Sequence, residues 1–126
     1  MKKLPESVIA ALDKSKIIGI RAGSEHRFIG VWPVVVLGRL FVRSWTRKPG
    51  GWYRTFLEDP RGAIQAGTRT INVRAKVVKS ERLKKAVDLA YRTKFNTPGA
   101  LNYVRGFHRP SRRNTTTEFV PARARR

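Results

Sequence analysis

The chain has 126 residues, 40% of them hydrophobic, and a formal net charge of +20, which is the size and composition of one strongly basic globular domain. The absence of cysteine excludes disulfides, thiolate metal sites and a cysteine nucleophile. No apolar run reaches the roughly 18 residues of a transmembrane helix, and the apolar stretch Val8–Leu12 is too short for a signal-peptide core. We therefore expect a cytoplasmic protein that makes no membrane contact and holds no metal.

The positive charge is spread along the chain rather than confined to one end. Seven of the 28 Lys and Arg residues, and one of the eight Asp and Glu residues, lie between Arg105 and Arg126. The rest of the chain keeps 21 basic and 7 acidic residues, so the predicted core is basic in its own right. A surface of this sign suits an anionic partner, either a nucleic acid or a phosphate-bearing small molecule.

The first predicted elements are a helix and a strand. Val8 and Leu12 lie at helical spacing and Pro5 suits a first turn, which predicts an amphipathic helix over residues 5–13. A strand is expected over residues 16–22, because apolar side chains are frequent there and a glycine-containing turn follows.

A hairpin is the next predicted feature. Two β-rich runs, residues 31–37 and 40–45, are joined across Gly38-Arg39. Glycine at the first central position of a two-residue loop is typical of a type II′ turn. The sequence therefore predicts two neighbouring antiparallel strands with Gly38 and Arg39 at the tip.

The middle of the chain predicts a short helix followed by two strands. Residues 52–59 form the predicted helix, which Pro60 ends. A short strand is expected over residues 62–66 and a longer one over residues 70–78. Apolar and polar residues alternate along the longer strand, which predicts one buried face and one basic, solvated face.

The last third of the chain predicts two helices and a strand. Residues 80–95 form an amphipathic helix with Ser80 as its cap, and residues 98–105 form a second, shorter helix. A basic loop is expected over residues 109–114, followed by a strand over residues 115–120.

Together these elements predict a mainly β, α+β fold, built as a small antiparallel barrel or curled sheet of about six strands. Its peripheral helices are expected at residues 5–13, 80–95 and 98–105. The domain is predicted to span residues 1–120, and residues 121–126 to form a basic, flexible tail.

The segment from Arg43 to Arg54 combines chemistry suited to one kind of ligand. It holds four of the 28 basic residues and two of the three tryptophans. Guanidinium groups suit phosphate oxygens, and indole faces can cover a flat ring. Gly50 and Gly51 let backbone N–H groups approach an anion. The segment thus predicts a partner with phosphate and a flat ring, which a nucleotide-like cofactor and a nucleic acid both satisfy.

No catalytic constellation of side chains is recognisable beside this segment. Ser-His-Asp arrangements, paired carboxylates and metal-ligand clusters are missing from the sequence, and His26 and His108 stand isolated in predicted loops.

Five sequence blocks resemble an uncharacterised bacterial domain family, over roughly residues 16 to 122. The blocks are Val31–Val36, Leu40–Ser44, Gly51–Arg54, Ala90–Phe95 and Thr115–Pro121. That family in turn resembles the flavin-binding split barrels, namely the pyridoxamine-phosphate-oxidase-like proteins and the deazaflavin-dependent reductases.

The deazaflavin-dependent reductases carry Trp, then Asn-Leu, then Asn-Pro after their second hairpin. Trp52, Phe56-Leu57 and Asp59-Pro60 stand in similar places here, so the chain departs from that pattern at Phe56 and Asp59.

The resemblance implies a homodimeric split barrel that binds FMN or deazaflavin near the dimer interface. It further implies an oxidoreductase that transfers hydride to a small substrate. Mapped onto this chain, the expected phosphate contacts are Arg43, Ser44, Arg47, Lys48 and Arg54. The expected ring-covering groups are Trp45 and Trp52.

Other interpretations of the same residues stay open. Arg43 could instead pair with Glu58 or Asp59, and Trp52 and Tyr53 could be core or dimer-contact aromatics. A nucleic-acid-binding module would use the polar face of the strand predicted at residues 70–78 and the arginine tail. A third class is a cofactor-free barrel with a structural or ligand-binding role.

Overall fold

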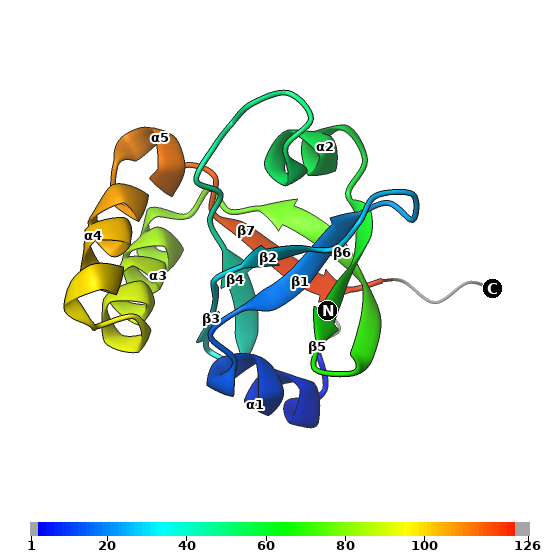
Figure 1. The fold of residues 1–126 in the computed structure, drawn as a ribbon, viewed down its shortest axis with the longest axis horizontal. Helices are drawn as coiled ribbons and strands as arrows, with labels where there is room; N and C mark the ends of the chain where they lie inside the picture. The colour runs from blue at the N-terminus through cyan, green and yellow to red at the C-terminus, as the bar shows by residue number, and fades with distance from the viewer. Residues whose placement is uncertain (1–2, 123–126) are drawn as a thin grey trace.

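Seven antiparallel strands form one curved sheet in the computed structural model, which describes residues 3–122 (Figure 1). The strands are β1 (Ile18–Ala22), β2 (Ile29–Val31), β3 (Pro33–Val36), β4 (Arg39–Val42), β5 (Arg61–Ala66), β6 (Arg69–Val77) and β7 (Thr117–Pro121). Along the sheet they follow the order β2-β1-β5-β6-β7-β4-β3. Trp32 alone separates β2 from β3 in the chain, so the two ends of the sheet meet there and nearly close a barrel. The antiparallel barrel predicted from the sequence is confirmed.

The described residues contain seven strands where about six were predicted, because a further strand, β2, begins at Ile29 and ends at Val31, and the run predicted over residues 31–37 is interrupted at Trp32, before Pro33. Proline has no N–H to donate to a ladder, and it restricts the backbone of the residue before it. The carbonyl of Trp32 accepts a hydrogen bond from the Tyr91 hydroxyl at 2.7 Å. As a result β2 pairs with β1, while β3 pairs with β4.

The turn between β3 and β4 differs from the prediction by one residue. Val36 pairs with Arg39, so Leu37 and Gly38 are the central residues. Both have positive φ, 55° and 70°, which is the pattern of a type I′ turn. The predicted type II′ turn at Gly38-Arg39 is therefore wrong, because Gly38 supplies the second positive φ rather than the first.

Helices cover the barrel on three sides (Figure 1). They are α1 (Glu6–Lys14), α2 (Trp52–Glu58), α3 (Glu81–Lys94), α4 (Pro98–Phe107) and α5 (Pro110–Arg113). The three predicted peripheral helices are confirmed within one or two residues, and α3 begins after the predicted Ser80 cap. The segment predicted as a basic loop over residues 109–114 instead contains the one-turn helix α5, with Pro110 at its first position.

Two hydrophobic clusters hold these elements together, and β4 contributes to both. Leu40 and Val42 point into the barrel, whereas Phe41 belongs to the cluster between the sheet and helices α3 and α4. This alternation is the period of two expected of a strand covered on both faces. Arg43, the residue after β4, continues the Phe41 side and enters the space beneath α3 and α4.

The last strands also show where the sequence prediction needed adjustment. Thr70, Asn72, Arg74 and Lys76 of β6 are exposed while Val73 is buried, as the alternation predicted. Pro121, predicted as the start of a flexible tail, is the last residue of β7, and the Ala122 N–H donates to the Asn72 carbonyl. The remaining tail residues, 123–126, lie outside the described part of the chain.

Candidate functional site

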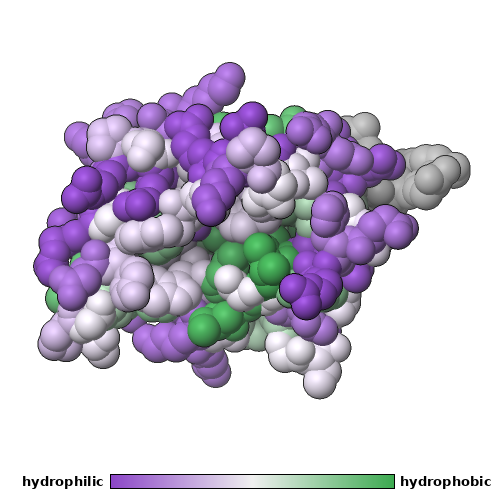
Figure 2. All heavy atoms as spheres, turned by 45° about the horizontal axis from the view of Figure 1, so that its top comes forward, coloured by the Kyte–Doolittle hydropathy of each residue, from purple (hydrophilic) through white to green (hydrophobic). Residues whose placement is uncertain are grey.

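An aromatic pocket of about 400 Å³ opens where the chain leaves β4, beside α2 and α4. That volume lies in the range of about 300–1,000 Å³ typical of small-molecule sites. Figure 2 shows hydrophobic side chains open to solvent near the middle of one face, surrounded by hydrophilic ones. The pocket is lined by Ile29, Gly30, Val31, Trp32, Arg43, Ser44, Trp45, Thr46, Gly51, Trp52, Tyr103 and Phe107. Four predicted site residues, Arg43, Ser44, Trp45 and Trp52, are therefore brought together here.

Trp45 is an exposed aromatic residue of this pocket, and several neighbouring residues hold its ring in place. Its ring makes edge contacts with Tyr103 and Phe107, each at a centroid distance of 5.5 Å. The Arg112 guanidinium lies 3.6 Å from the ring centroid, and its Nε donates to the Trp45 carbonyl at 2.9 Å. A Cβ on Gly106 would come within 2.6 Å of the ring carbon Cζ3, so only glycine lets the indole pack on α4. The ring is thus held in place while 44% of Trp45 stays exposed.

Trp52 and Trp32 form two further aromatic walls of the pocket. Trp52 is the first residue of α2, and its ring contacts Phe56 at 6.2 Å. Trp32, at the break between β2 and β3, stacks on Phe95 at 4.4 Å with an interplanar angle of 7°. Sequence reasoning missed Trp32 as a site residue, although a tryptophan directly before Pro33 in an apolar run marks a strand interruption.

Tyr103 and Phe107 of α4 were also missed. Their spacing of four residues places both rings on one helix face, which the sequence could have indicated. The predicted helix stopped at residue 105 and therefore left Phe107 outside it.

Arg43 lines the pocket, but its guanidinium is committed to the protein interior. NH1 lies 2.7 Å from Asp88 Oδ1, Nε donates to Thr116 Oγ1 at 2.8 Å, and NH2 donates to the Lys84 carbonyl at 3.0 Å. Arg43 therefore does pair with a carboxylate, but the partner is Asp88, so the alternative pairing with Glu58 or Asp59 is wrong. Burial lowers the pKa of Arg43, and the hydrogen bond and charge of Asp88 oppose that shift.

Ser44 is buried beside Arg43 and fixes the start of the loop. Its N–H donates to Thr115 Oγ1 at 2.8 Å, and its hydroxyl donates to the Thr46 carbonyl. These contacts tie Ser44, just after the end of β4, to the Thr115 side chain and to the backbone of Thr46. Arg43 and Ser44 therefore fix the backbone at the edge of the pocket, directly before Trp45.

The remaining predicted phosphate contacts, Arg47 and Lys48 on the exposed loop and Arg54 in α2, do not line the pocket. Arg54 donates to the Arg47 carbonyl at 3.2 Å, and the Arg47 guanidinium lies 5.9 Å from the Tyr53 ring centroid. The Lys48 side chain is exposed, while its backbone N–H donates to Thr46 Oγ1. The structure thus separates Arg47, Lys48 and Arg54 from the four residues that meet in the pocket.

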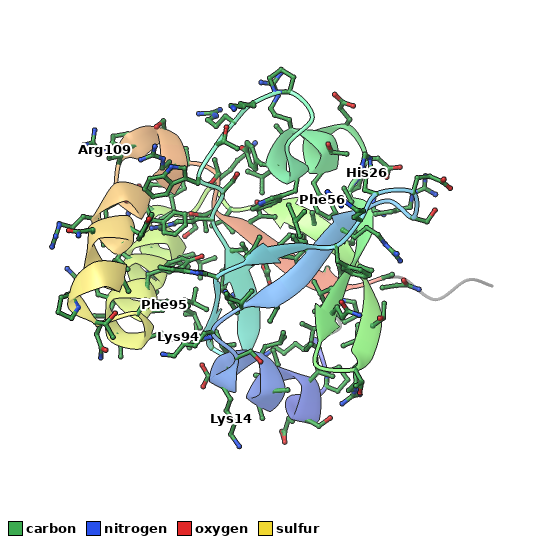
Figure 3. All side chains as sticks on the ribbon, in the orientation of Figure 1. Lys14, His26, Phe56, Lys94, Phe95 and Arg109 are labelled. Atoms are coloured by element: carbon green, nitrogen blue, oxygen red, sulfur yellow. The ribbon has the colours of Figure 1, made fainter. Side chains whose placement is uncertain are left out.

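Phe56, where the deazaflavin pattern has Asn, belongs to the barrel core. Figure 3 shows it on the side of α2 that faces the sheet, and its ring packs 5.3 Å from that of Phe119. A Cβ on Gly62 would come within 2.7 Å of the Phe56 ring, so the two residues fit tightly. At the position where the deazaflavin-dependent reductases carry a polar Asn, this chain thus has an apolar side chain that packs in the core.

A second hollow, of about 600 Å³, adjoins the pocket at Trp45. Its lining residues are Trp45, Asn102, Arg105, Gly106, Arg109, Ser111 and Arg112. Sequence reasoning did not assign these arginines to the site, because some sixty residues separate them from Trp45 in the chain. Their density between residues 105 and 113 was visible, but their approach to Trp45 depends on how α4 packs.

Residues 3–122 hold no group of three or more His, Asp or Glu side chains suited to a metal ion. In that same part of the chain, every helix is too short or too polar to cross a membrane.

Solved structures with a similar fold cover nearly the whole chain. The conserved hypothetical protein Rv2991 of Mycobacterium tuberculosis has a TM-score of 0.63 and 12% identity, over 100% of this chain and 87% of its own. A Listeria innocua protein assigned as a pyridoxamine 5′-phosphate oxidase has a TM-score of 0.61 and 11% identity, over 95% and 94%. A FAD-binding protein of Mesorhizobium loti has a TM-score of 0.58 and 12% identity, over 95% and 91%.

These likenesses establish the fold, and the split barrel implied by the sequence resemblance is confirmed. No curated protein sequence matches the chain. The profile of one family, described as uncharacterized protein conserved in bacteria, matches residues 8–119. This range includes most of the barrel and every residue that lines the aromatic pocket. The chain therefore belongs to that family, DUF2255.

Proposed function

We propose that this chain binds FMN or a deazaflavin, with the flat ring of the cofactor in the aromatic pocket. The observation that carries the proposal is the pocket itself, in which Trp45, Trp52 and Tyr103 surround about 400 Å³ next to the rigid end of β4. Apolar, aromatic walls with a few polar groups are what a flat heteroaromatic ring requires. The similarity to a FAD-binding protein and to an assigned pyridoxamine 5′-phosphate oxidase supports the same ligand class.

The residues of the pocket suit a ring and have separate tasks. Trp45 and Trp52 would cover the ring, since both line the pocket and neither is fully buried. Gly30 and Gly51 contribute backbone to the wall of the pocket. Arg43 acts as a positioning residue, because its contacts with Asp88 and Thr116 hold the strand end from which Trp45 projects.

A bound flavin or deazaflavin supplies hydride transfer, and the protein orients it and excludes water from one side. The open mouth of the pocket, where Ile29, Trp45 and Tyr103 are 43–55% exposed, leaves access for a small substrate. The proposed activity is therefore that of an oxidoreductase. A second copy of the chain covering part of this mouth would complete the site as a homodimer.

The alternative of nucleic-acid binding has weaker support in the fold. The exposed face of β6 presents Thr70, Asn72, Arg74 and Lys76, and no aromatic side chain alternates with them. Such a face offers phosphate contacts without a stacking platform for bases. A salt-titrated binding assay with single-stranded DNA tests this alternative directly.

The test of cofactor binding is a visible absorption spectrum after incubation with FMN or deazaflavin and desalting. The wild type should retain the chromophore, and Trp45→Ala should weaken binding by about tenfold or more, because stacking on one aromatic ring contributes about 1–3 kcal/mol. Leu89→Ala is the matched control, since Leu89 is an exposed apolar residue of α3 away from the pocket. A colourless wild type after both incubations would indicate a cofactor-free barrel.

A further inference from the structure

The hollow next to the aromatic pocket is lined by three arginines. Arg105 lies in the last turn of α4, Arg109 between α4 and α5, and Arg112 in α5. Figure 3 places Arg109 at the junction of the two helices, on the outside of the molecule. The other lining residues are Trp45, Asn102, Gly106 and Ser111, so no carboxylate of the described chain lines the hollow.

These three guanidinium groups keep donors that the protein does not use. Arg112 uses Nε for the Trp45 carbonyl, and Arg105 donates from NH2 to Asn102 Oδ1. Within residues 3–122, the Arg109 side chain makes no hydrogen bond or ion pair. A guanidinium carries five N–H donors, so each of the three arginines retains donors for a ligand.

Two acidic side chains of α3 are paired with other arginines. Asp88 pairs with Arg43 and with Arg113, and Glu81 also pairs with Arg113. These two carboxylates of α3 are thus paired with Arg43 and Arg113 rather than with Arg105, Arg109 or Arg112. The three that surround the hollow keep an uncompensated positive charge, which favours an anion with several oxygen acceptors.

Trp45 connects this hollow to the aromatic pocket, because its side chain lines both. The indole rests on Gly106 and lies under the Arg112 guanidinium, so its position depends on residues of the hollow. A ligand whose ring contacts Trp45 in the pocket would therefore extend its substituent past the indole edge and into the arginine-lined hollow.

We infer that the hollow formed by Arg105, Arg109 and Arg112 is a phosphate-binding subsite for the side chain of the cofactor. The connection to a ring rests on the proposed function. The subsite takes the role that the sequence gave to the exposed residues Arg47, Lys48 and Arg54. Three guanidinium groups around one hollow suit a terminal phosphate, and they suit a diphosphate better because a diphosphate offers more acceptor oxygens.

The experiment compares FMN with riboflavin, which share a ring and differ in the phosphate. Calorimetric titrations of the wild type should show a preference for FMN of about tenfold or more, which decreases as salt rises. Arg109→Ala should reduce that preference about tenfold and leave riboflavin affinity unchanged. Arg54→Ala is the matched control, because Arg54 is an exposed arginine of α2 that lines neither hollow, and it should keep the preference. An Arg109→Ala variant with the wild-type preference would overturn the subsite, and loss of preference in Arg54→Ala would place the phosphate beside α2.

The outcomes separate the subsite from the proposed function. Riboflavin binding with a phosphate preference that ignores Arg109 would leave the ring site standing and overturn the subsite. If neither flavin binds, the proposed function fails, and inorganic pyrophosphate is titrated instead. Pyrophosphate binding that weakens in Arg109→Ala and persists in Arg54→Ala would support the anion site, whereas equal or no binding would overturn it.

Discussion

Arg43 and Arg109 are the same residue type in two different environments, on either side of Trp45. Arg43 is 2% exposed and pairs with Asp88 at 2.7 Å, whereas Arg109 lies on the surface beside a hollow that lacks carboxylates. A buried arginine must be paired, and once paired it has little left to offer a ligand. The arginine that holds the site together and the arginines that are open to an anion are therefore different residues.

The largest expected effect comes from breaking the buried pair. Arg43→Ala should lower the free energy of unfolding by about 3–5 kcal/mol, because it leaves the Asp88 carboxylate without its closest partner and opens a cavity. Urea unfolding followed by circular dichroism measures this loss. Asp88→Asn should also destabilise the protein strongly, since Arg43 would remain buried with its charge. A loss below about 1 kcal/mol in both variants would contradict the structural role of Arg43.

The contact between Trp45 and α4 gives the next largest effect. Gly106→Ala would place a Cβ within 2.6 Å of the indole, so it should cost about 1–3 kcal/mol and shift the tryptophan fluorescence. Gly99→Ala is the matched control on the same helix, because nothing lies within 4 Å of a Cβ at that position. The control should leave stability unchanged or raise it slightly through helix propensity. Equal effects of the two substitutions would show that the indole does not rest on Gly106.

Lys94 is a third basic residue to compare with Arg43 and Arg109, because it is half-buried and its ammonium group donates to backbone carbonyls instead of a carboxylate. Its Nζ donates to the carbonyls of Leu12 at 3.1 Å and Pro33 at 2.8 Å, where α3 meets α1 and β3 (Figure 3). Burial lowers the pKa of Lys94 from its ordinary value of 10.5 to about 8, opposed by the charge of Asp13.

A lowered pKa means that the folded state releases the Lys94 proton more readily than the unfolded chain. The unfolded chain therefore binds more protons between pH 8 and 10.5, and the contribution of Lys94 to stability should rise with pH across that window. Denaturation of the wild type and of Lys94→Met at a series of pH values isolates this contribution. A stability difference between the two proteins that stays constant, or that moves in favour of Lys94→Met, would contradict the shift.

The smallest expected effect on stability is that of Arg109→Ala. Substitutions of exposed side chains without partners usually change the unfolding free energy by less than about 0.5 kcal/mol. Thermal and urea unfolding of this variant should therefore match the wild type while its anion binding is weakened. A large loss of stability would show that Arg109 has a structural role comparable to that of Arg43.

Local sequence patterns predicted most of the fold, whereas the candidate site depends on contacts between residues that are far apart in the sequence. The alternation along β6 and the Ser80 cap of α3 were readable because each depends on near neighbours in the chain. The turn at Leu37-Gly38 was misplaced by one residue, since glycine suits either central position when its φ is positive.

The fold brings some of the predicted site residues together in one pocket and leaves the others outside it. Trp45 and Trp52 meet in one pocket because α2 follows directly from the loop after β4. Asp88 could not be identified as the partner of Arg43, because that pair depends on the position of α3 against the sheet. Nor could the approach of Arg112 to Trp45, 67 residues apart, be read from either segment alone.

The most direct test of the account is a titration of FMN with the wild-type protein, read by flavin fluorescence. A flavin ring stacked on Trp45 should lose its emission by contact quenching, and the account predicts saturable quenching that Trp45→Ala weakens by about tenfold or more. Unchanged flavin emission at high protein concentration, or equal quenching by Trp45→Ala, would contradict the placement of a cofactor ring in this pocket.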